Sequence, residues 1–541
     1  MVVTVASGSI EHRTAVAAAR VKFLVAWGLL LFLKAAFAAS MPLFGDEAFY
    51  AWSSLHPAWA YSDLPGATAA LVAIGTALGG DTVFGVRLAF LALGALLPWL
   101  VVRIARRIGG EGDAWQAGLW SLPIPLLLPM GVMALPDVLL TVSALLALDA
   151  LLGLLMPQQG GAVAADRGAS RAAAGLHLQL ALGLAMGALA HYRMAPLLLV
   201  GALAFLASGD RRPLRQPGLW VALAIGVLAW WPVVHFNLGA DAAGLRFQFV
   251  ERHPWAFHAQ GLAQPLLQAI ITTPLLYGLL LWALLRGARA SLDPASDRPR
   301  RFLAIAGLGL WVLYAAMAPF VDRARFSLHW PLPAYLVAAA LLPVALRDAA
   351  ARAWPRRLAP WALGFAAAAT MSMAALFAIP ASPVLAARTA GTPLYPDNFV
   401  GWREMANALR PRLDPRDVVV ADHFMLAAQL SFELGRRREV FVLDHWNNHK
   451  HGRAAQIALW GYDEAGIAGI AAGTRAWIAF EVAETPEADR AAWVSRLCRW
   501  FDAIEPVAAV DGPGGGKRFW LYRATARGAE AGVDCRVPPP S

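Results

Sequence analysis

Charged residues are scarce in this chain of 541 residues. Asp, Glu, Lys and Arg together make up 15% of it, against about 25% in an ordinary soluble domain. Hydrophobic residues make up 58%, and the mean hydropathy is +0.52. This composition excludes an ordinary soluble protein and indicates a polytopic membrane protein.

Cysteine is also scarce, and two common motifs are missing. Cys498 and Cys535 are the two cysteines, and no CxxC or Cys/His zinc pattern surrounds them. They could form one disulfide in an oxidising compartment, or remain two thiols. The Gly-rich "DGPGGGK" lacks the GxxxxGK[ST] spacing of a phosphate-binding loop, so we expect a hairpin turn there.

The net charge of +10 does not indicate a nucleic-acid partner, because the arginines fall at the ends of apolar runs. A membrane span needs about 20 apolar residues. Eleven segments are candidates, and they lie near 21–40, 83–102, 114–134, 137–156, 173–190, 194–208, 218–236, 264–285, 302–320, 330–346 and 358–380. The apolar segment 65–79 is shorter, so we expect it to be an interfacial helix.

Basic residues alternate between the loops. One set of loops holds most of the arginines, and the other holds most of the loop acids, including Asp46, Asp63 and Asp137. The positive-inside rule places the first set in the cytoplasm. We therefore expect a multi-pass protein of the cell inner (plasma) membrane, with Asp46 and the C-terminal region on the periplasmic side.

The composition changes after residue 380. Strand-like "DVVVAD", "REVFVL", "RAWIAFE" and "KRFWLYRA" surround helix-like segments, one of which is "HFMLAAQLSFELG". The predicted fold is thus mainly α: a polytopic helical bundle over 1–380, followed by an extracytoplasmic α/β domain over 381–541. A domain of that length can bury its own core.

Three acidic places stand at predicted outer mouths of spans. They are Asp46 and Glu47 in "PLFGDEAFYAW", Tyr61 and Asp63 in "WAYSDLPG", and Asp137 in "MALPDVLL". Ionisable groups in such places are costly and usually face a cavity or a partner, and we expect Asp46 and Asp137 to converge on one such opening. A carboxylate that stays ionised can accept a proton from a hydroxyl nucleophile, which contributes about 10²–10⁴-fold to a rate.

A basic and aromatic set has a matching chemistry, because Arg and His side chains bind phosphate. It comprises His191, Tyr192 and Arg193 in "AHYRM", Arg252 in "VERHPW", and His329 in "HWPLPAY". Plainer interpretations remain open. Asp46 and Asp137 could cap helices, Arg193 could snorkel from a span end, and His329 could belong to an interfacial belt.

Several of these motifs together resemble the GT-C glycosyltransferases, in the branch of the protein O-mannosyltransferases and the lipid A aminoarabinose transferase. They are "FGDEAFYAW", "YSDLPGATAALVAIGTALGGDTVFGVRL", "LPDVLL", "AHYRMAPLLL", "HWPLPAYL" and "VVVADHFMLAAQLSFELG". The resemblance implies transfer of a sugar from a polyprenyl-phosphate-linked donor. The acceptor would be a hydroxyl of lipid A, a protein or a polysaccharide.

The resemblance also implies site residues. Asp46 matches the catalytic acid that lies by the acceptor, and Asp137 matches a supporting aspartate. The remaining candidates would contact substrate, and they are Glu47, Tyr61, Asp63, His191, Tyr192, Arg193, Arg252 and His329. We predict no metal site, although Glu47, Asp63 and His253 could meet and hold a divalent metal. We interpret "DHWNNHKH", with His445, His449 and His451, as a solvated loop.

Two other classes of function remain open. A multi-pass transporter or lipid flippase of cell-envelope glycolipids would show inverted repeats and ionisable residues near the bilayer midplane. A membrane-anchored interaction protein would act through its outer α/β domain.

Overall fold

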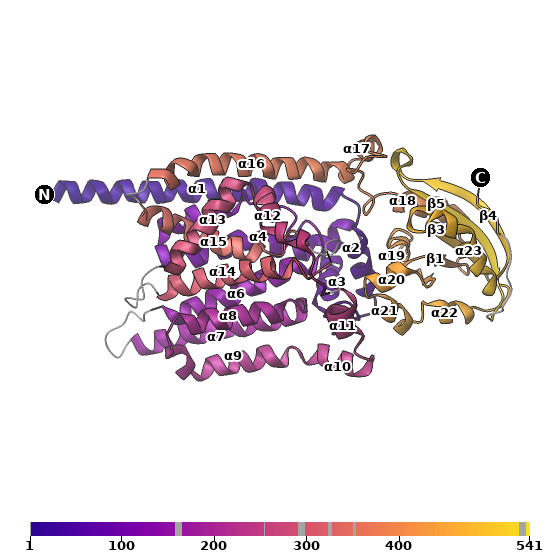
Figure 1. Ribbon diagram of the computed structural model, residues 1–541, viewed down its shortest axis with the longest axis horizontal. Helices are drawn as coiled ribbons and strands as arrows, with labels where there is room; N and C mark the ends of the chain where they lie inside the picture. Colours follow the sequence, from indigo (N-terminus) through magenta and orange to yellow (C-terminus); the bar gives the residue numbers. More distant parts are fainter. Residues whose placement is uncertain are drawn as a thin grey trace. The chain divides into compact units, whose positions relative to one another are not determined.

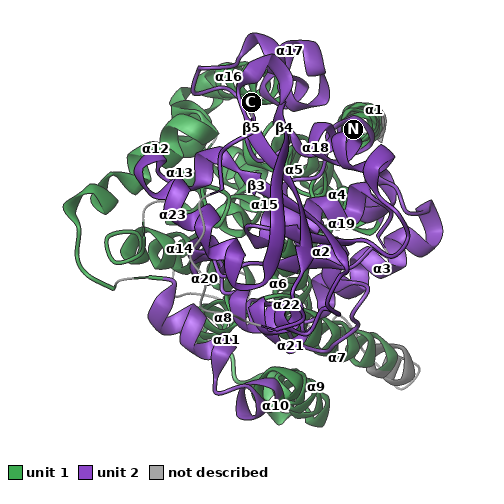
Figure 2. Cartoon of the chain, turned by 90° about the vertical axis from the view of Figure 1, so that its right-hand side faces the viewer, with its two compact units in different colours: residues 1–36, 89–235, 253–374 green, residues 37–88, 236–252, 375–541 purple. Residues whose placement is uncertain are grey.

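The structure is a computed structural model of the chain (Figure 1). It describes residues 2–156, 165–253, 255–289, 298–322, 327–349, 353–436, 438–529 and 537–540, with side chains omitted at 2–12 and 165–170. The described chain divides into two compact units (Figure 2). Unit 1 comprises residues 1–36, 89–235 and 253–374, and unit 2 comprises residues 37–88, 236–252 and 375–541.

Unit 1 is helical. Its helices are α1 (Val2–Ser40, to residue 36), α4 (Val83–Gly109, from residue 89), α5 (Glu111–Ser121), α6 (Pro136–Leu155), α7 (Ala165–Ala190), α8 (Met194–Ala207), α9 (Pro217–Leu228), α10 (Trp231–Gly239, to residue 235), α12 (Gln264–Thr272), α13 (Pro274–Arg289), α14 (Arg298–Met317), α15 (Leu332–Asp348) and α16 (Ala353–Ala381, to residue 374). Helix α6 is predominantly apolar and almost wholly buried, so it forms the core of this unit.

Seven of the eleven predicted spans coincide with helices that are long and apolar enough to cross a membrane. An eighth, predicted near 264–285, is a pair of helices bent by 113° at Thr273, so it is a broken span or a re-entrant loop. Three others are shorter helices: α5 has 11 residues, α8 has 14 and α15 has 17. The chain is thus a multi-pass membrane protein, but the count of eleven is not confirmed.

Prolines explain the largest of these differences. The segment predicted near 114–134 contains Pro123, Pro125 and Pro129, which lack the N–H that a continuing helix needs. Helix α5 accordingly ends at Ser121, and a single 3-10 turn, η1 (Pro125–Leu127), follows. The apolar run is long enough to span, but its backbone is irregular.

Unit 2 contains all of the predicted C-terminal α/β region, together with residues 37–88 and 236–252. Its five-stranded sheet has the order β2-β1-β3-β5-β4. The strands are β1 (Val418–Ala421), β2 (Val440–Val442), β3 (Arg475–Glu481), β4 (Phe501–Asp511) and β5 (Arg518–Ala526). Strands β2, β1 and β3 are parallel, whereas β5 and β4 are antiparallel to their neighbours.

The other helices of unit 2 lie in its three segments. They are α2 (Gly45–Ser53), α3 (Ala67–Gly79), α11 (Ala243–Arg246), α17 (Pro383–Arg388), α18 (Trp402–Leu409), α19 (Phe424–Glu433), α20 (Trp446–Lys450), α21 (Ala454–Leu459), α22 (Glu464–Ala468) and α23 (Glu487–Ser495), and the π-helical turn η3 (Phe247–Glu251) follows α11. The four predicted strands, the helix after β1 and the hairpin at "DGPGGGK" are confirmed. Strand β4 was not predicted.

Cys498 is buried and disulfide-bonded. The chain's other cysteine, Cys535, lies outside the described residues.

Candidate active site

Asp46 lies in the first turn of α2, where backbone N–H groups and the helix dipole favour a carboxylate. The aromatic residues that follow it, Phe49, Tyr50 and Trp52, are buried and hold this helix in unit 2. The Asp46 side chain keeps 28% of its surface exposed. The acid is therefore fixed by packing but still accessible to a substrate.

Glu47, the neighbouring acid, is fully buried and paired with Arg87. The Arg87 Nε donates to Glu47 Oε1 at 2.7 Å, and Nη2 donates to Oε2 at 2.6 Å. The backbone N–H of Phe44 also donates to Oε2, at 2.8 Å. The other Arg87 donors reach backbone carbonyls of Ala38, Met41 and Pro42. Both oxygens are engaged, so we interpret Glu47 as a residue that fixes the start of α2 rather than as a substrate ligand.

Arg453 links Asp46 to Asp63. Its Nη1 donates to Asp46 Oδ1 at 2.7 Å, and its Nε and Nη2 each lie 3.3 Å from Asp63 Oδ2. The guanidinium carbon lies 4.3 Å from the ring centre of Phe49 and 4.5 Å from that of Phe424. Packing between two rings leaves this side chain 3% exposed and holds it in one position.

The two carboxylates of this cluster differ in acidity. Burial raises the pKa of Asp46, but the charges of Arg453, His451 and Arg252 outweigh that effect and hold it below its usual range. Burial and the charge of Asp46 raise the pKa of Asp63, despite the attraction of Arg453. Environments that separate two pKa values in this way assign different roles to two acids. Asp46, whose pKa lies below its usual range, is ionised at neutral pH and can accept a proton.

The loop of Tyr61 and Asp63 is tied down by backbone contacts. The Tyr61 hydroxyl is within hydrogen-bonding distance of the carbonyls of Ser53 and His56, at 3.1 and 2.9 Å, and of the N–H of Ala58. Tyr61 is 3% exposed. With its hydroxyl engaged in this way, we interpret Tyr61 as a residue that shapes the loop, so its predicted contact with the donor stays a prediction.

Two further segments of unit 2 hold the same loop. The N–H of Ser62 donates to Gln456 Oε1 at 3.0 Å, and its hydroxyl donates to the carbonyl of Gly452 at 2.6 Å. Gln248 donates to the carbonyl of Asp63 at 2.7 Å and accepts from Arg252 Nη1 at 3.1 Å. Asp46 and Asp63 are therefore joined by Arg453, and Arg252 is linked to the same loop through Gln248.

A second cluster lies in unit 1, around Asp137. This residue is in the first turn of α6, directly after Pro136, and forms an ion pair with Arg193. His329 Nε2 lies 3.0 Å from Asp137 Oδ1. The guanidinium of Arg193 also lies 4.5 Å from the ring centre of Trp330. The structure thus brings together an acid and two bases that lie far apart in the sequence.

His191 orients Arg193. The Arg193 N–H donates to His191 Nδ1 at 3.0 Å, and its Nε lies 3.4 Å from His191 Nε2. His191 and Tyr192 are both buried. Four of the predicted substrate residues, His191, Tyr192, Arg193 and His329, therefore belong to unit 1 with Asp137, while Asp46 belongs to unit 2. The predicted convergence of Asp46 and Asp137 on one opening stays a prediction.

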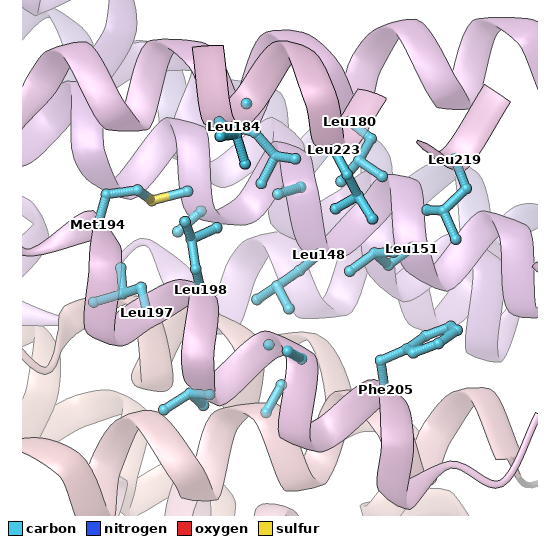
Figure 3. Close-up of a pocket in the computed structure, with 18 of the residues that line it drawn as sticks. Leu148, Leu151, Leu180, Leu184, Met194, Leu197, Leu198, Phe205, Leu219 and Leu223 are labelled. Atoms are coloured by element: carbon cyan, nitrogen blue, oxygen red, sulfur yellow. The ribbon is translucent and has the colours of Figure 1, made fainter. Parts of the chain in front are cut away.

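Unit 1 also contains an apolar cavity of about 460 Å³, and Met194, the residue after Arg193, is part of its lining. Figure 3 shows its lining, which includes Met194 and Leu197 of α8, Leu148 of α6, and Leu180 and Leu184 of α7. Every lining residue is apolar. Arg193 of the Asp137 cluster and Met194 of the cavity lining are thus consecutive residues.

The sequence does not indicate Arg453, because its segment has no catalytic motif and its pairing with Asp46 depends on the tertiary fold. The solvated loop expected nearby is wrong for His445, which is buried and caps α20. His449 is exposed as expected. Within the described ranges, no group of three or more His, Cys, Asp or Glu could hold a metal ion, so a divalent metal stays untested.

Comparisons with known proteins agree with this architecture. Residues 63–236, which include Asp63, Asp137 and Arg193, match the family model described as dolichyl-phosphate-mannose-protein mannosyltransferase. The crystal structure of ArnT from Cupriavidus metallidurans in the apo state is similar with a TM-score of 0.64 and 15% identity, covering 93% of this chain and 98% of that chain. The chain has the GT-C fold.

A second ArnT structure from the same organism, bound to undecaprenyl phosphate, has a TM-score of 0.65 and 17% identity. It covers 92% of this chain and 97% of that chain. No curated protein matches the sequence. The resemblance to the GT-C superfamily that the motifs predicted is confirmed by the family model and by these two structures.

Proposed function

We propose that this chain is a membrane glycosyltransferase that moves a sugar from a polyprenyl-phosphate-linked donor to an acceptor hydroxyl. The observation that carries the proposal is the Asp46 carboxylate, ionised and accessible, held by Arg453 at the start of α2. The acceptor is lipid A, a protein or a polysaccharide. We place the reaction on the periplasmic side of the inner membrane, because the arginine-poor loops carry Asp46 and Asp137.

In the proposed reaction, Asp46 accepts the proton of the acceptor hydroxyl as its oxygen attacks the anomeric carbon. The bond between that carbon and the phosphate oxygen breaks, and polyprenyl phosphate leaves with the bonding electrons. One displacement inverts the anomeric centre. General base catalysis of this kind contributes about 10²–10⁴-fold.

Arg193 and His329 have the chemistry to bind the donor phosphate, because charge-assisted hydrogen bonds from guanidinium and imidazole groups suit phosphate oxygens. In the structure Arg193 forms an ion pair with Asp137, and His329 Nε2 lies 3.0 Å from Asp137 Oδ1. The cavity that begins at Met194 would take the first part of the polyprenyl tail. Burial of each CH₂ contributes about 0.8 kcal/mol, so the tail keeps the donor in the membrane.

Two facts support the lipid-linked donor. The matching family model is named for enzymes that use dolichyl phosphate mannose, and one ArnT structure was determined with undecaprenyl phosphate bound. The identities of 15% and 17% establish a common fold, so the donor and the acceptor are our proposals for this chain.

The experiment that tests the proposal compares surface glycans by mass spectrometry in wild-type cells, a deletion strain and a complemented strain. We expect one sugar substituent to disappear on deletion and to return on complementation. NMR of the product would then give the anomeric configuration. An unchanged set of glycans contradicts the transferase, and retention at the anomeric centre contradicts the single displacement.

A further inference from the structure

A second cavity, of about 450 Å³, lies in unit 1 where α13 ends, α14 begins and α15 ends. These three helices pack against one another. Its polar lining consists of Arg286 and Arg289 from α13, Arg300 from α14 and Asp348 from α15. Apolar side chains complete it, among them Trp282, Leu341 and Val344. The cavity therefore joins a basic mouth to an apolar wall.

The charges of this cavity do not cancel. Asp348 is already shared, because Arg300 Nη1 lies 3.2 Å from its Oδ2 and Arg347 Nε lies 3.5 Å from its Oδ1. Arg286 donates to the backbone carbonyl of Asp348, at 2.9 Å, and, among the contacts of the described residues, not to its carboxylate. Among the residues that the structure describes, three arginines and one aspartate line the cavity, and these four side chains carry a net charge of +2. This is a site that favours an anion.

The rim of the cavity is typical of a membrane interface. The rings of Trp282 and Trp354 lie 5.6 Å apart, edge to face, and Arg286 lies 5.9 Å from the ring centre of Trp282. Leu285 and Trp354 are exposed, at 38% and 46%. Tryptophan next to arginine at the end of a span lies at the level of lipid head groups.

We propose that this cavity binds the phosphate head group of an anionic phospholipid of the surrounding bilayer. Basic pockets between membrane helices bind anionic head groups in this way. The apolar wall and the exposed Trp354 and Leu285 favour a ligand that carries acyl chains over free phosphate. The inference stands apart from the proposed sugar transfer, since no residue of the Asp46 or Asp137 cluster lines this cavity.

Native mass spectrometry of the detergent-solubilised full chain tests the proposal. The protein is titrated with phosphatidylglycerol and with phosphatidylcholine of the same acyl chains. We expect phosphatidylglycerol to bind more tightly, and the double variant R286Q/R289Q to weaken its binding by about fivefold for each arginine removed. Arg289 is exposed on the last turn of α13, so R289Q alone provides a variant that preserves folding.

The matched control is R356Q/R357Q. It removes the same charge from the exposed start of α16, outside the cavity. We expect this control to bind phosphatidylglycerol as the wild type does. Equal binding of the two phospholipids, or equal losses in both double variants, overturns the proposal. Displacement of the lipid by an equal concentration of inorganic phosphate, or by undecaprenyl phosphate in an arginine-dependent way, also overturns it, because the ligand would then be a different phosphate.

Discussion

Arg453 donates one hydrogen bond to Asp46, at 2.7 Å, and two longer ones to Asp63, at 3.3 Å. The arginine is contributed by the segment before α21, about 400 positions along the chain from both acids. Since residues 375–541 and 37–88 belong to one unit, the C-terminal α/β region supplies a residue to the Asp46 cluster. This relationship makes the C-terminal region part of the proposed site rather than an appendage.

The first prediction concerns the acidity of Asp46. Arg453 is the largest influence that lowers the pKa of Asp46, so Arg453→Gln raises that pKa. Asp46 must be ionised to act as a base, so activity is lost as pH falls through its pKa. We expect the acid limb of the pH–rate profile of Arg453→Gln to move to higher pH.

The control for that experiment is Arg416→Gln, which removes an exposed arginine from the same unit. Its profile should coincide with that of the wild type. If Arg453→Gln is folded and active with an unmoved acid limb, Asp46 is not the titrating base.

The second prediction concerns the buried pair of Glu47 and Arg87. Both side chains are 0% exposed, so Glu47→Gln leaves the charge of Arg87 buried without its partner. Breaking a buried ion pair costs about 3–5 kcal/mol. We expect a clear loss of thermal stability in detergent. Glu505→Gln, which breaks the exposed pair with Arg523, should change stability by about 1 kcal/mol or less. Equal stability of the two variants contradicts a structural role for Glu47.

Much of this fold could be predicted from the sequence, because its spans and strands depend on the properties of neighbouring residues. Apolar length located the spans, and strand propensity located β1, β2, β3 and β5. Strand β4 was not predicted, because apolar and polar residues alternate only weakly along it and Pro506 interrupts it at a register shift. The bend at Thr273 likewise depends on a positive φ of 71°, which composition does not reveal.

In the candidate site, too, the sequence predicts the residues of local motifs but not their partners from distant segments. Motifs identified Asp46, Asp63, Asp137 and Arg193, because each lies in a short recognisable segment. The partners that set their chemistry come from distant segments, as Arg453 does for Asp46 and His329 for Asp137. Hydropathy and motif spacing carry no information about such tertiary pairs, so only the fold reveals them.

The third prediction concerns Arg193. If this side chain binds the donor phosphate, Arg193→Met should raise KM for the lipid-linked donor by about tenfold or more, since hydrogen bonds to charged groups contribute about 1.5–3 kcal/mol. KM for the acceptor should stay within twofold of wild type in steady-state assays. Arg211→Met, at an exposed position of unit 1, is the control. A rise in the acceptor KM instead would place Arg193 at the acceptor.

The fourth prediction tests the cavity of Figure 3. Gly201 lines it and has open space around the position of a Cβ, so Gly201→Leu fills the cavity without a clash. Each displaced CH₂ forfeits about 0.8 kcal/mol. We expect KM to rise about tenfold for a full-length polyprenyl donor and to change little for a donor with one or two isoprene units.

Gly364→Leu is the matched control, because Gly364 also has open space, lies in α16 and does not line the cavity. It should leave KM for both donors unchanged. An equal effect of Gly201→Leu on short and long donors means that the tail does not occupy this cavity.

The most direct measurement of the central claim is sugar transfer by Asp46→Asn, compared with Asp489→Asn at an exposed position of the same unit. Both proteins are purified in full length, checked for folding by thermal unfolding, and assayed with the polyprenyl-phosphate-linked donor. The account predicts that Asp46→Asn loses about 10²-fold or more in kcat, while Asp489→Asn retains wild-type activity. A folded Asp46→Asn enzyme with near wild-type kcat would contradict it.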